Sequence, residues 1–343
     1  MLLKVENVGL DAVATCISDK CVTLEERLKD IADADKITRL KELTGFERFS
    51  IAAEGICASD YCAAAAEKLF DEIAIDRKEI RAVLFVSQTP DYVMPSTAHV
   101  LHDRLRLSRD AAAIDINLGC SGYVYGLYIA ASMLGNLPDG KILLLCGDTP
   151  ARNMFRDDIS CQSIFGDGGS ASILSKCDGR KMFFNLQTFG EYANAIIKPR
   201  GGYRKPLMIE NNSIDVRENF VTMDGARIME FSTRFVPPNL SELMEFSAVE
   251  PSTVELFLIH QANRLIVETI AERLALPKEK FPFRAQKIGN TSSASIPLVL
   301  TEMRRLNEPT KFLTVMSGFG VGMSIASAVV DLSDTIILPT GEF

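Results

Sequence analysis

Strand-like and helix-like patterns alternate along this chain, and they do so twice in the same order. Buried-strand patterns are predicted at 81–86, 111–116, 141–146 and 170–174 in the first half, and at 254–259, 281–285, 311–316 and 325–332 in the second. Helical patterns separate them at 58–72, 94–107, 121–137, 224–235, 263–276 and 293–306; Pro237 and Pro238 are predicted to end the fourth, and a short pattern follows at 240–246. This alternation predicts an α/β protein whose sheets are covered by helices.

The two halves keep a nearly constant offset. Lys141 and Lys311 begin corresponding strand patterns, Cys120 and Asn290 occupy corresponding strand-to-helix joints, and each pair is 170 positions apart. We therefore predict an internal duplication whose pseudo-twofold axis brings the ends of corresponding strands together. The predicted halves comprise residues 1–175 and 176–343.

A stripe of small residues marks the helical pattern at 121–137. Gly122, Gly126 and Ala130 are four positions apart and therefore lie on one face of a helix. We expect this face to pack closely against the corresponding helix at 293–306.

Cys120 stands at the first of these joints, after Gly119 and before Ser121. Unpaired N–H groups and the helix dipole at a helix N-terminus favour a thiolate, so we expect a pKa lowered towards neutrality and a nucleophilic role. The other seven cysteines form no CxxC pair and follow no glycine, so they are interpreted as reduced structural thiols. His260 and Asn290 each follow a strand-like run or a glycine and are candidate partners of Cys120.

The composition excludes several classes of protein. A net charge of −8 argues against general nucleic-acid binding and against binding to anionic membranes. The first residues lack the pattern of a secretory signal, and the apolar run at 123–137 is shorter than the ~20 residues of a membrane span. Eight cysteines without a disulfide framework predict a soluble protein of the reducing cytoplasm. His99 and His102 fit a solvated helix face, and we expect no metal site.

Several motifs in fixed order make the chain resemble the thiolase-fold condensing enzymes, and among them the β-ketoacyl-acyl-carrier-protein synthase III family. The motifs are Thr44-Gly45-Phe46-Glu47-Arg48, Cys120-Ser121-Gly122, Phe165-Gly166-Asp167-Gly168-Gly169, Pro199-Arg200-Gly201-Gly202-Tyr203, Met223-Asp224-Gly225, His260-Gln261-Ala262-Asn263, Gly289-Asn290-Thr291-Ser292 and Gly318-Phe319-Gly320-Val321-Gly322. The resemblance implies a thiolase-like fold in which two βαβαβ halves form a five-layered αβαβα core.

The resemblance also implies a reaction. Cys120 would accept an acyl group, and His260 and Asn290 would stabilise the enolate formed when a malonyl thioester loses CO2. Backbone N–H groups of Cys120 and of the Ser317–Gly318 turn would hold the oxyanion. The product would be a β-ketoacyl thioester of fatty-acid or related lipid biosynthesis, made from acyl-CoA or acyl-carrier-protein and malonyl-carrier-protein without a cofactor or metal.

The remaining expected contacts follow from the same resemblance. Family members primed by acyl-CoA usually hold the adenine between a tryptophan and an arginine, but this chain has no tryptophan and places Arg39 and Ile159 at those positions. We expect Arg39, Met94, Asn263 and Phe319 to contact substrate, with Met94 at the point where a neighbouring subunit usually contributes to the acyl pocket. A homodimer is expected, with the strand at 111–116 at its interface. Arg264, Arg273, Lys278 and Lys280 are either a docking patch for the carrier protein or ordinary solvated charges.

Two other functions stay open at this point. One is an acyltransferase that moves the acyl group from Cys120 to an alcohol or amine, although such variants often replace the asparagine found here as Asn290. The other is a non-catalytic chain-binding partner subunit, although these generally lack the cysteine.

Overall fold

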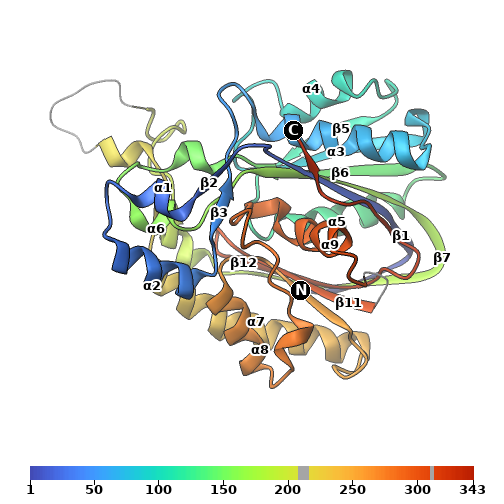
Figure 1. The fold of residues 1–343 in the computed structure, drawn as a ribbon. Helices are drawn as coiled ribbons and strands as arrows, with labels where there is room; N and C mark the ends of the chain where they lie inside the picture. Colours follow the sequence, from blue (N-terminus) through green and yellow to red (C-terminus); the bar gives the residue numbers. More distant parts are fainter. Residues whose placement is uncertain (208–215, 310–312) are drawn as a thin grey trace.

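The computed structural model describes residues 1–207, 216–309 and 313–343. Helices and strands stack in five layers (Figure 1). The first layer contains α3 (Ala58–Ile73) and α4 (Thr97–Arg104), which cover a sheet of β5 (Ala112–Ile116), β4 (Ile80–Val86) and β6 (Lys141–Asp148). The middle layer contains α5 (Gly122–Leu134) and α9 (Ser295–Arg305). The second sheet contains β10 (Leu256–Ile259), β11 (Leu313–Gly320) and β12 (Ser324–Asp331), and it is covered by α7 (Gly225–Ser247) and α8 (Arg264–Arg273). The predicted αβαβα core is confirmed.

Two long strands join both sheet layers. In the described residues the strand order is β10-β11-β12-β7-β6-β4-β5, and β1 (Leu2–Ile17) pairs along β7 (Gly168–Thr188). Residues 168–175 of β7 pair with β6, and residues 183–188 pair with β12. The predicted boundary between residues 175 and 176 therefore lies inside one continuous strand, and the division into two halves stays a prediction.

The middle helix α5 is almost entirely apolar because it is enclosed between the sheet layers. The sequence predicts that its small residues face the helical pattern at 293–306; Gly122 does lie near Ser293 of that range, but Gly122 and Gly126 approach the strands more closely. A Cβ atom on Gly122 would lie 2.5 Å from Val86 of β4, and one on Gly126 would lie 2.6 Å from Leu144 of β6. The absence of side chains thus lets α5 approach β4 and β6, which belong to the same sheet as β5, the strand that precedes Cys120.

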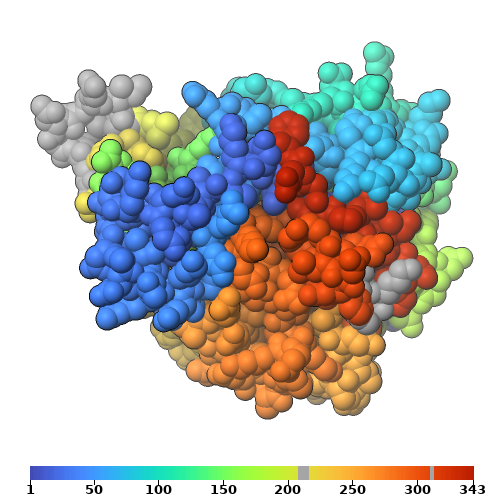
Figure 2. Space-filling model, in the orientation of Figure 1, coloured from blue at the N-terminus to red at the C-terminus, as the bar shows by residue number. Residues whose placement is uncertain are grey.

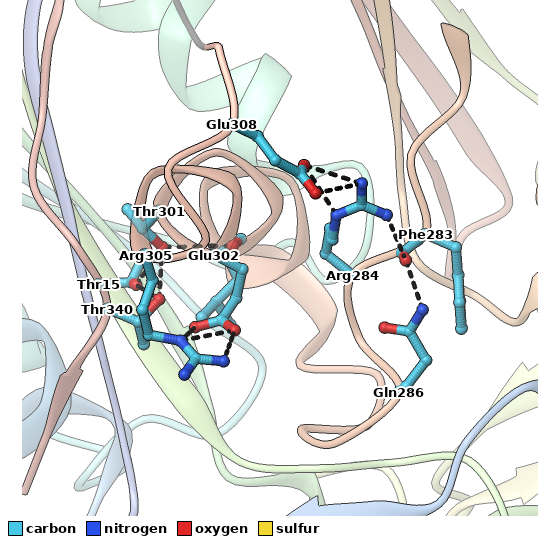
Figure 3. A network of polar contacts seen from close by, with 10 residues as sticks. Thr15, Phe283, Arg284, Gln286, Thr301, Glu302, Arg305, Glu308 and Thr340 are labelled. Atoms are coloured by element: carbon cyan, nitrogen blue, oxygen red, sulfur yellow. Dashed lines mark hydrogen bonds and ion pairs between the residues drawn. The ribbon is translucent and has the colours of Figure 1, made fainter. Parts of the chain in front are cut away.

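Two predicted elements are wrong, and both lie in the second half. Helix α7 continues through Pro237 and Pro238, because its buried face packs on the core beneath β11 and β12 and compensates the lost backbone hydrogen bonds. Residues 281–285 are irregular instead of forming a strand. The Arg284 N–H donates to Gln261 Oε1 at 3.0 Å, and its guanidinium pairs with Glu308 at 2.7 Å (Figure 3).

The remaining predicted strands and helices are confirmed with shifted ends, although residues 311 and 312 of the predicted 311–316 strand lie outside the described residues. The smaller elements are β2 (Cys21–Thr23), α1 (Leu24–Leu28), α2 (Ala34–Thr44), β3 (Arg48–Ser50), α6 (Ile159–Gln162), β8 (Ile196–Ile197), β9 (Thr222–Met223), β13 (Ile336–Ile337) and β14 (Gly341–Glu342), with short 3-10 turns η1 (Arg77–Glu79), η2 (Pro150–Asn153), η3 (Gly190–Ala195), η4 (Val216–Asn219), η5 (Lys278–Lys280) and η6 (Ser292–Ala294).

The N-terminal segment that contains α1 and α2 lies against the C-terminal half of the chain (Figure 2). The rings of Phe46 and Phe283 are 5.5 Å apart, and Gly45 contacts Arg264 of α8. Within the described residues, no helix is both long and apolar enough to cross a membrane. The interleaving of distant segments creates the walls of the cavity described next.

Candidate active site

Cys120 lies at the joint between β5 and α5, directly before the N-cap residue Ser121. Its side chain is 6% exposed, and its sulfur is 3.9 Å from Ser292 Oγ. Gly320, with φ at +155°, presses its backbone against the cysteine, since a Cβ there would lie 3.0 Å from the sulfur. Only glycine provides both this conformation and this close approach.

The thiol of Cys120 differs from the sequence prediction in its acidity. Burial raises its pKa to about 12, and the negative charge of Asp148 acts in the same direction. The hydroxyl of Ser292 and the backbone of Val321 favour the thiolate but do not outweigh burial. The predicted lowering of the pKa is therefore wrong for the resting protein, in which Cys120 is a neutral thiol at pH 7.

His260 follows β10, and its position is fixed on two sides. Its backbone N–H donates to the Ser317 carbonyl at 2.8 Å, and its Nδ1 atom is 2.6 Å from Ser295 Oγ. The imidazole packs edge-on against the ring of Phe319 at a centroid distance of 5.6 Å. Burial lowers the pKa of His260 to about 3, so the imidazole is neutral at physiological pH.

Asn290 stands beside this imidazole. Its Nδ2 atom is 3.5 Å from His260 Nε2, and its Oδ1 atom accepts a hydrogen bond from the Ser292 N–H at 2.9 Å. The second contact fixes which end of the amide faces the histidine, because only the oxygen can accept from the backbone. The amide nitrogen is thus directed towards His260 as a donor.

One cavity of about 910 Å³ connects these side chains. Its lining includes the three predicted catalytic residues and two of the predicted substrate contacts, which are Cys120, His260, Asn290, Asn263 and Phe319. Residues 40, 43 and 44 of α2 line the cavity as well. Cys120 and Asn290, which are 170 positions apart in the sequence, are therefore gathered around a single space.

Three predicted contacts, Arg39, Ser317 and Gly318, do not line this cavity, and the contact predicted for Met94 across a subunit interface stays a prediction. Arg39 is exposed on α2 and is absent from the cavity wall, and Met94 is 72% exposed on the surface. Ser317 and Gly318 are buried in β11 and do not line the cavity. The backbone of residues 320–322 lines it instead, and this segment lies beside the sulfur.

The predicted basic patch is spread along both ends of α8. Arg264 lies in the first turn with its guanidinium 5.5 Å from the Phe283 ring centroid, and Arg273 is exposed in the last turn. Lys278 forms ion pairs with two glutamates of α8, and Lys280 donates to three backbone carbonyls of the loop before β10. The ammonium groups of Lys278 and Lys280 are thus already engaged by contacts within the protein.

Asp148 is a functional residue that the sequence did not predict, although an acid at the end of a buried strand is a recognisable signal. It is 1% exposed, and its Oδ1 accepts from the Gln88 N–H at 2.8 Å and from Ser87 Oγ at 3.1 Å. Its Oδ2 accepts from Ser293 Oγ at 2.7 Å and from the Ser293 N–H at 3.2 Å. This carboxylate therefore ties the ends of β4 and β6 to the turn that carries Asn290.

Comparison with known proteins identifies the family. The models described as 3-Oxoacyl-[acyl-carrier-protein (ACP)] synthase III and 3-Oxoacyl-[acyl-carrier-protein (ACP)] synthase III C terminal match residues 114–190 and 244–332. These ranges contain Cys120 and the His260–Asn290 pair, respectively.

Full-length relatives agree with this match. The beta-ketoacyl-[acyl-carrier-protein] synthase III of Streptococcus suis is 30% identical over 94% of this chain and 98% of its own length, and that of Latilactobacillus sakei is 32% identical over 79% and 84%. The crystal structure of a 3-oxoacyl-(acyl-carrier protein) synthase from Burkholderia xenovorans LB400 superposes with a TM-score of 0.93 at 32% identity, covering 100% of this chain and 99% of that one. The chain belongs to the β-ketoacyl-acyl-carrier-protein synthase III family of condensing enzymes.

Proposed function

We propose that this enzyme catalyses a decarboxylative Claisen condensation, in which an acyl group held on Cys120 is extended by a malonyl thioester. The observation that carries the proposal is the convergence of Cys120, His260 and Asn290 on one cavity. The thiol supplies a nucleophile, and the imidazole and amide supply two directed donors.

In the first half-reaction, the Cys120 sulfur attacks the carbonyl carbon of an acyl thioester. Its proton passes to Nε2 of neutral His260, whose Nδ1–H then donates to Ser295 Oγ. Backbone N–H groups of Cys120 and of the Gly320–Val321 turn stabilise the oxyanion. When the tetrahedral intermediate collapses, the carbon–sulfur bond to the donor breaks, and the leaving thiolate takes the proton from the imidazolium.

In the second half-reaction, the bond between the malonyl carboxylate and the α-carbon breaks, and its electron pair moves onto the thioester oxygen. His260 Nε2–H and Asn290 Nδ2–H stabilise this enolate, each by about 3 kcal/mol in a preorganised site. Between the two half-reactions, proton exchange with solvent converts His260 from the Nδ1–H to the Nε2–H tautomer. The Ser295 hydroxyl supports the new tautomer because it can donate to Nδ1 as readily as it accepts. The enolate carbon attacks the acyl carbonyl, and Cys120 leaves as a thiolate that takes a proton from solvent.

The substrates we propose are malonyl-carrier-protein and an acyl group delivered on coenzyme A or on a carrier protein, in the cytoplasm. Arg264 and Arg273 are the members of the predicted docking patch that remain open to a carrier protein. Reversing both to Glu should raise the apparent KM for the carrier protein without changing the alkylation of Cys120. An unchanged KM would exclude this patch.

We further propose a homodimer formed along β5. This strand ends the sheet in the described residues, and its Ile114 is 41% exposed. Tyr92, Val93 and Met94 are 59%, 77% and 72% exposed, which makes an apolar surface suited to a partner subunit. Sedimentation of the wild type and of Ile114→Lys tests this proposal, since the substitution should yield monomers. A monomeric wild type would refute it.

The condensation itself is tested by supplying acyl thioesters followed by malonyl-carrier-protein. We expect intact-mass spectrometry to show one acyl group on Cys120, and we expect CO2 release and a β-ketoacyl product in equal amounts. Transfer of the acyl group to an alcohol or amine without CO2 release would identify an acyltransferase. Absence of any adduct on Cys120 with a panel of acyl donors would favour a non-catalytic chain-binding subunit.

A further inference from the structure

The ionisable groups that line the cavity differ in whether a neighbouring group balances their charge. Among its described lining residues, Asp148 is fully hydrogen-bonded and His260 is neutral. Arg200 donates through Nε to Glu218 at 2.7 Å, so its charge is paired. Lys198 also lines the cavity, and no described carboxylate lies within ion-pair distance of it. An unpaired positive charge therefore faces the space in which we place the thioester.

Lys198 is held in place although it has no anionic partner. It directly follows β8, which pairs with β9, and its Nζ donates to Asn153 Oδ1 at 2.7 Å. Asn153 ends the turn that follows β6 and is itself fixed, because its carbonyl accepts from the Val221 N–H at 2.8 Å. Both side chains line the same cavity as Cys120.

This pair leaves a set of donors unused. Within the described part of the chain, the remaining Lys198 ammonium protons and both protons of Asn153 Nδ2 have no protein partner. An ammonium and an amide side by side match the oxygens of a carboxylate or phosphate, which accept several hydrogen bonds at once. The Lys198 side chain is exposed to solvent, but the desolvation that it does undergo lowers its pKa, and a bound anion would offset that cost.

We propose that Lys198 and Asn153 form a binding subsite for an anionic oxygen group of the thioester substrate. Two parts of such a substrate offer this chemistry: a carboxylate at the far end of the acyl group, and the phosphate of the phosphopantetheine arm. The proposal rests on the proposed function, since it takes the cavity to be the thioester site. It extends that function by assigning a charge preference to the wall of the cavity.

Binding measurements test the subsite without requiring catalysis. In a Cys120→Ala background, calorimetry would compare succinyl-phosphopantetheine with butyryl-phosphopantetheine, and butyryl-phosphopantetheine with butyryl-pantetheine. Each ligand would be titrated into protein with Lys198, with Lys198→Met, and with Lys205→Met. Lys205 is the matched control, because it is an exposed lysine of the same segment, like Lys198, but does not line the cavity.

Each source of the anion gives its own result. If the subsite binds an acyl carboxylate, Lys198→Met weakens succinyl-phosphopantetheine about tenfold and leaves both butyryl ligands unchanged. If it binds the phosphate, the substitution weakens both phosphorylated ligands about tenfold and leaves butyryl-pantetheine unchanged. Equal affinities in Lys198→Met and Lys205→Met for every ligand, or no detectable binding to any of the three proteins, would overturn the proposal.

Failure of the subsite is distinguishable from failure of the proposed function. The condensation is judged by acylation of Cys120 and CO2 release in the otherwise unmodified enzyme, neither of which enters the binding comparison. Normal condensation together with binding that does not depend on the Lys198 charge would refute the proposed subsite alone. Binding that depends on the Lys198 charge, without any acylation of Cys120, would support the subsite and refute the proposed catalytic function.

Discussion

The joints that carry Cys120 and Asn290 occupy corresponding places in the sequence but differ in structure. The first turns directly from Gly119 through Cys120 into α5, and its N-cap residue makes no side-chain capping bond in the described structure. The second takes a longer path through η6, with Ser292 at φ +53°, before α9 begins. There, the side chain of Asn290 binds the backbone of its own turn.

This structural difference matches the two proposed roles, a nucleophile at the first joint and a stabiliser of negative charge at the second. A nucleophile must move onto the substrate and form a bond, and the nearest side-chain partner of the Cys120 sulfur is the Ser292 hydroxyl, at a loose 3.9 Å. A group that stabilises charge is effective when it is already oriented, and Asn290 is held through its oxygen with its nitrogen facing His260. Substitutions at each joint should therefore affect different steps.

The largest effect is expected at the first joint. Cys120→Ala removes the only sulfur that lines the described cavity apart from Met side chains, so acyl-enzyme formation should be abolished and condensation should fall at least ~10³-fold. Intact-mass spectrometry after incubation with an acyl thioester measures the adduct. Cys177→Ala is the control and should acylate normally; an adduct that persists in Cys120→Ala would place the nucleophile elsewhere.

Asn290→Ala should separate the two half-reactions. Loss of one oriented donor to the enolate is worth about 3 kcal/mol, so CO2 release should fall about 10²-fold while Cys120 is still acylated at a similar rate. Rapid-quench measurement of acylation beside malonyl decarboxylation makes the comparison. Equal losses in both steps would mean that the second joint also serves the nucleophile.

Asp148→Asn tests the link between the joints. Removing the negative charge should lower the pKa of Cys120, so the pH profile of iodoacetamide alkylation should move to lower pH. In the wild type the alkylation rate should rise about tenfold per pH unit up to about pH 12, because only the thiolate reacts.

The same substitution presents an amide to the N–H donors of Gln88 and Ser293, so the condensation rate should fall roughly tenfold. Ser87→Ala removes one hydrogen bond to Asp148 but keeps its charge, and it should leave the alkylation profile in place. A profile that does not move in Asp148→Asn would show that this carboxylate has only a structural role.

The smallest effect is expected from Ser295→Ala. It removes the hydrogen bond to His260 Nδ1, and a neutral hydrogen bond of about 1 kcal/mol corresponds to a rate loss of roughly fivefold. The loss should appear in both half-reactions, since we propose that His260 acts in each. Ser295→Thr keeps a hydroxyl and should restore most of the rate; if it does not, packing around the imidazole and not this hydrogen bond sets the rate.

Part of this protein could be predicted directly from its amino-acid sequence. The periodicity of apolar residues indicates most helices and strands, because burial of one face repeats with the geometry of each element. The joints at Cys120, His260 and Asn290 could also be identified, since polar residues that follow buried strands stand out against the apolar pattern.

The tertiary structure decided what local patterns do not contain. Helix α7 persists through two prolines because long-range packing outweighs local propensity, and 281–285 forgoes a strand because Gln261 and Glu308 engage Arg284. The acidity of Cys120 is opposite to its local prediction, because a pKa depends on the solvent and charges that the complete fold places around a thiol. Lys198 and Asn153 are 45 positions apart, and only folding makes them neighbours.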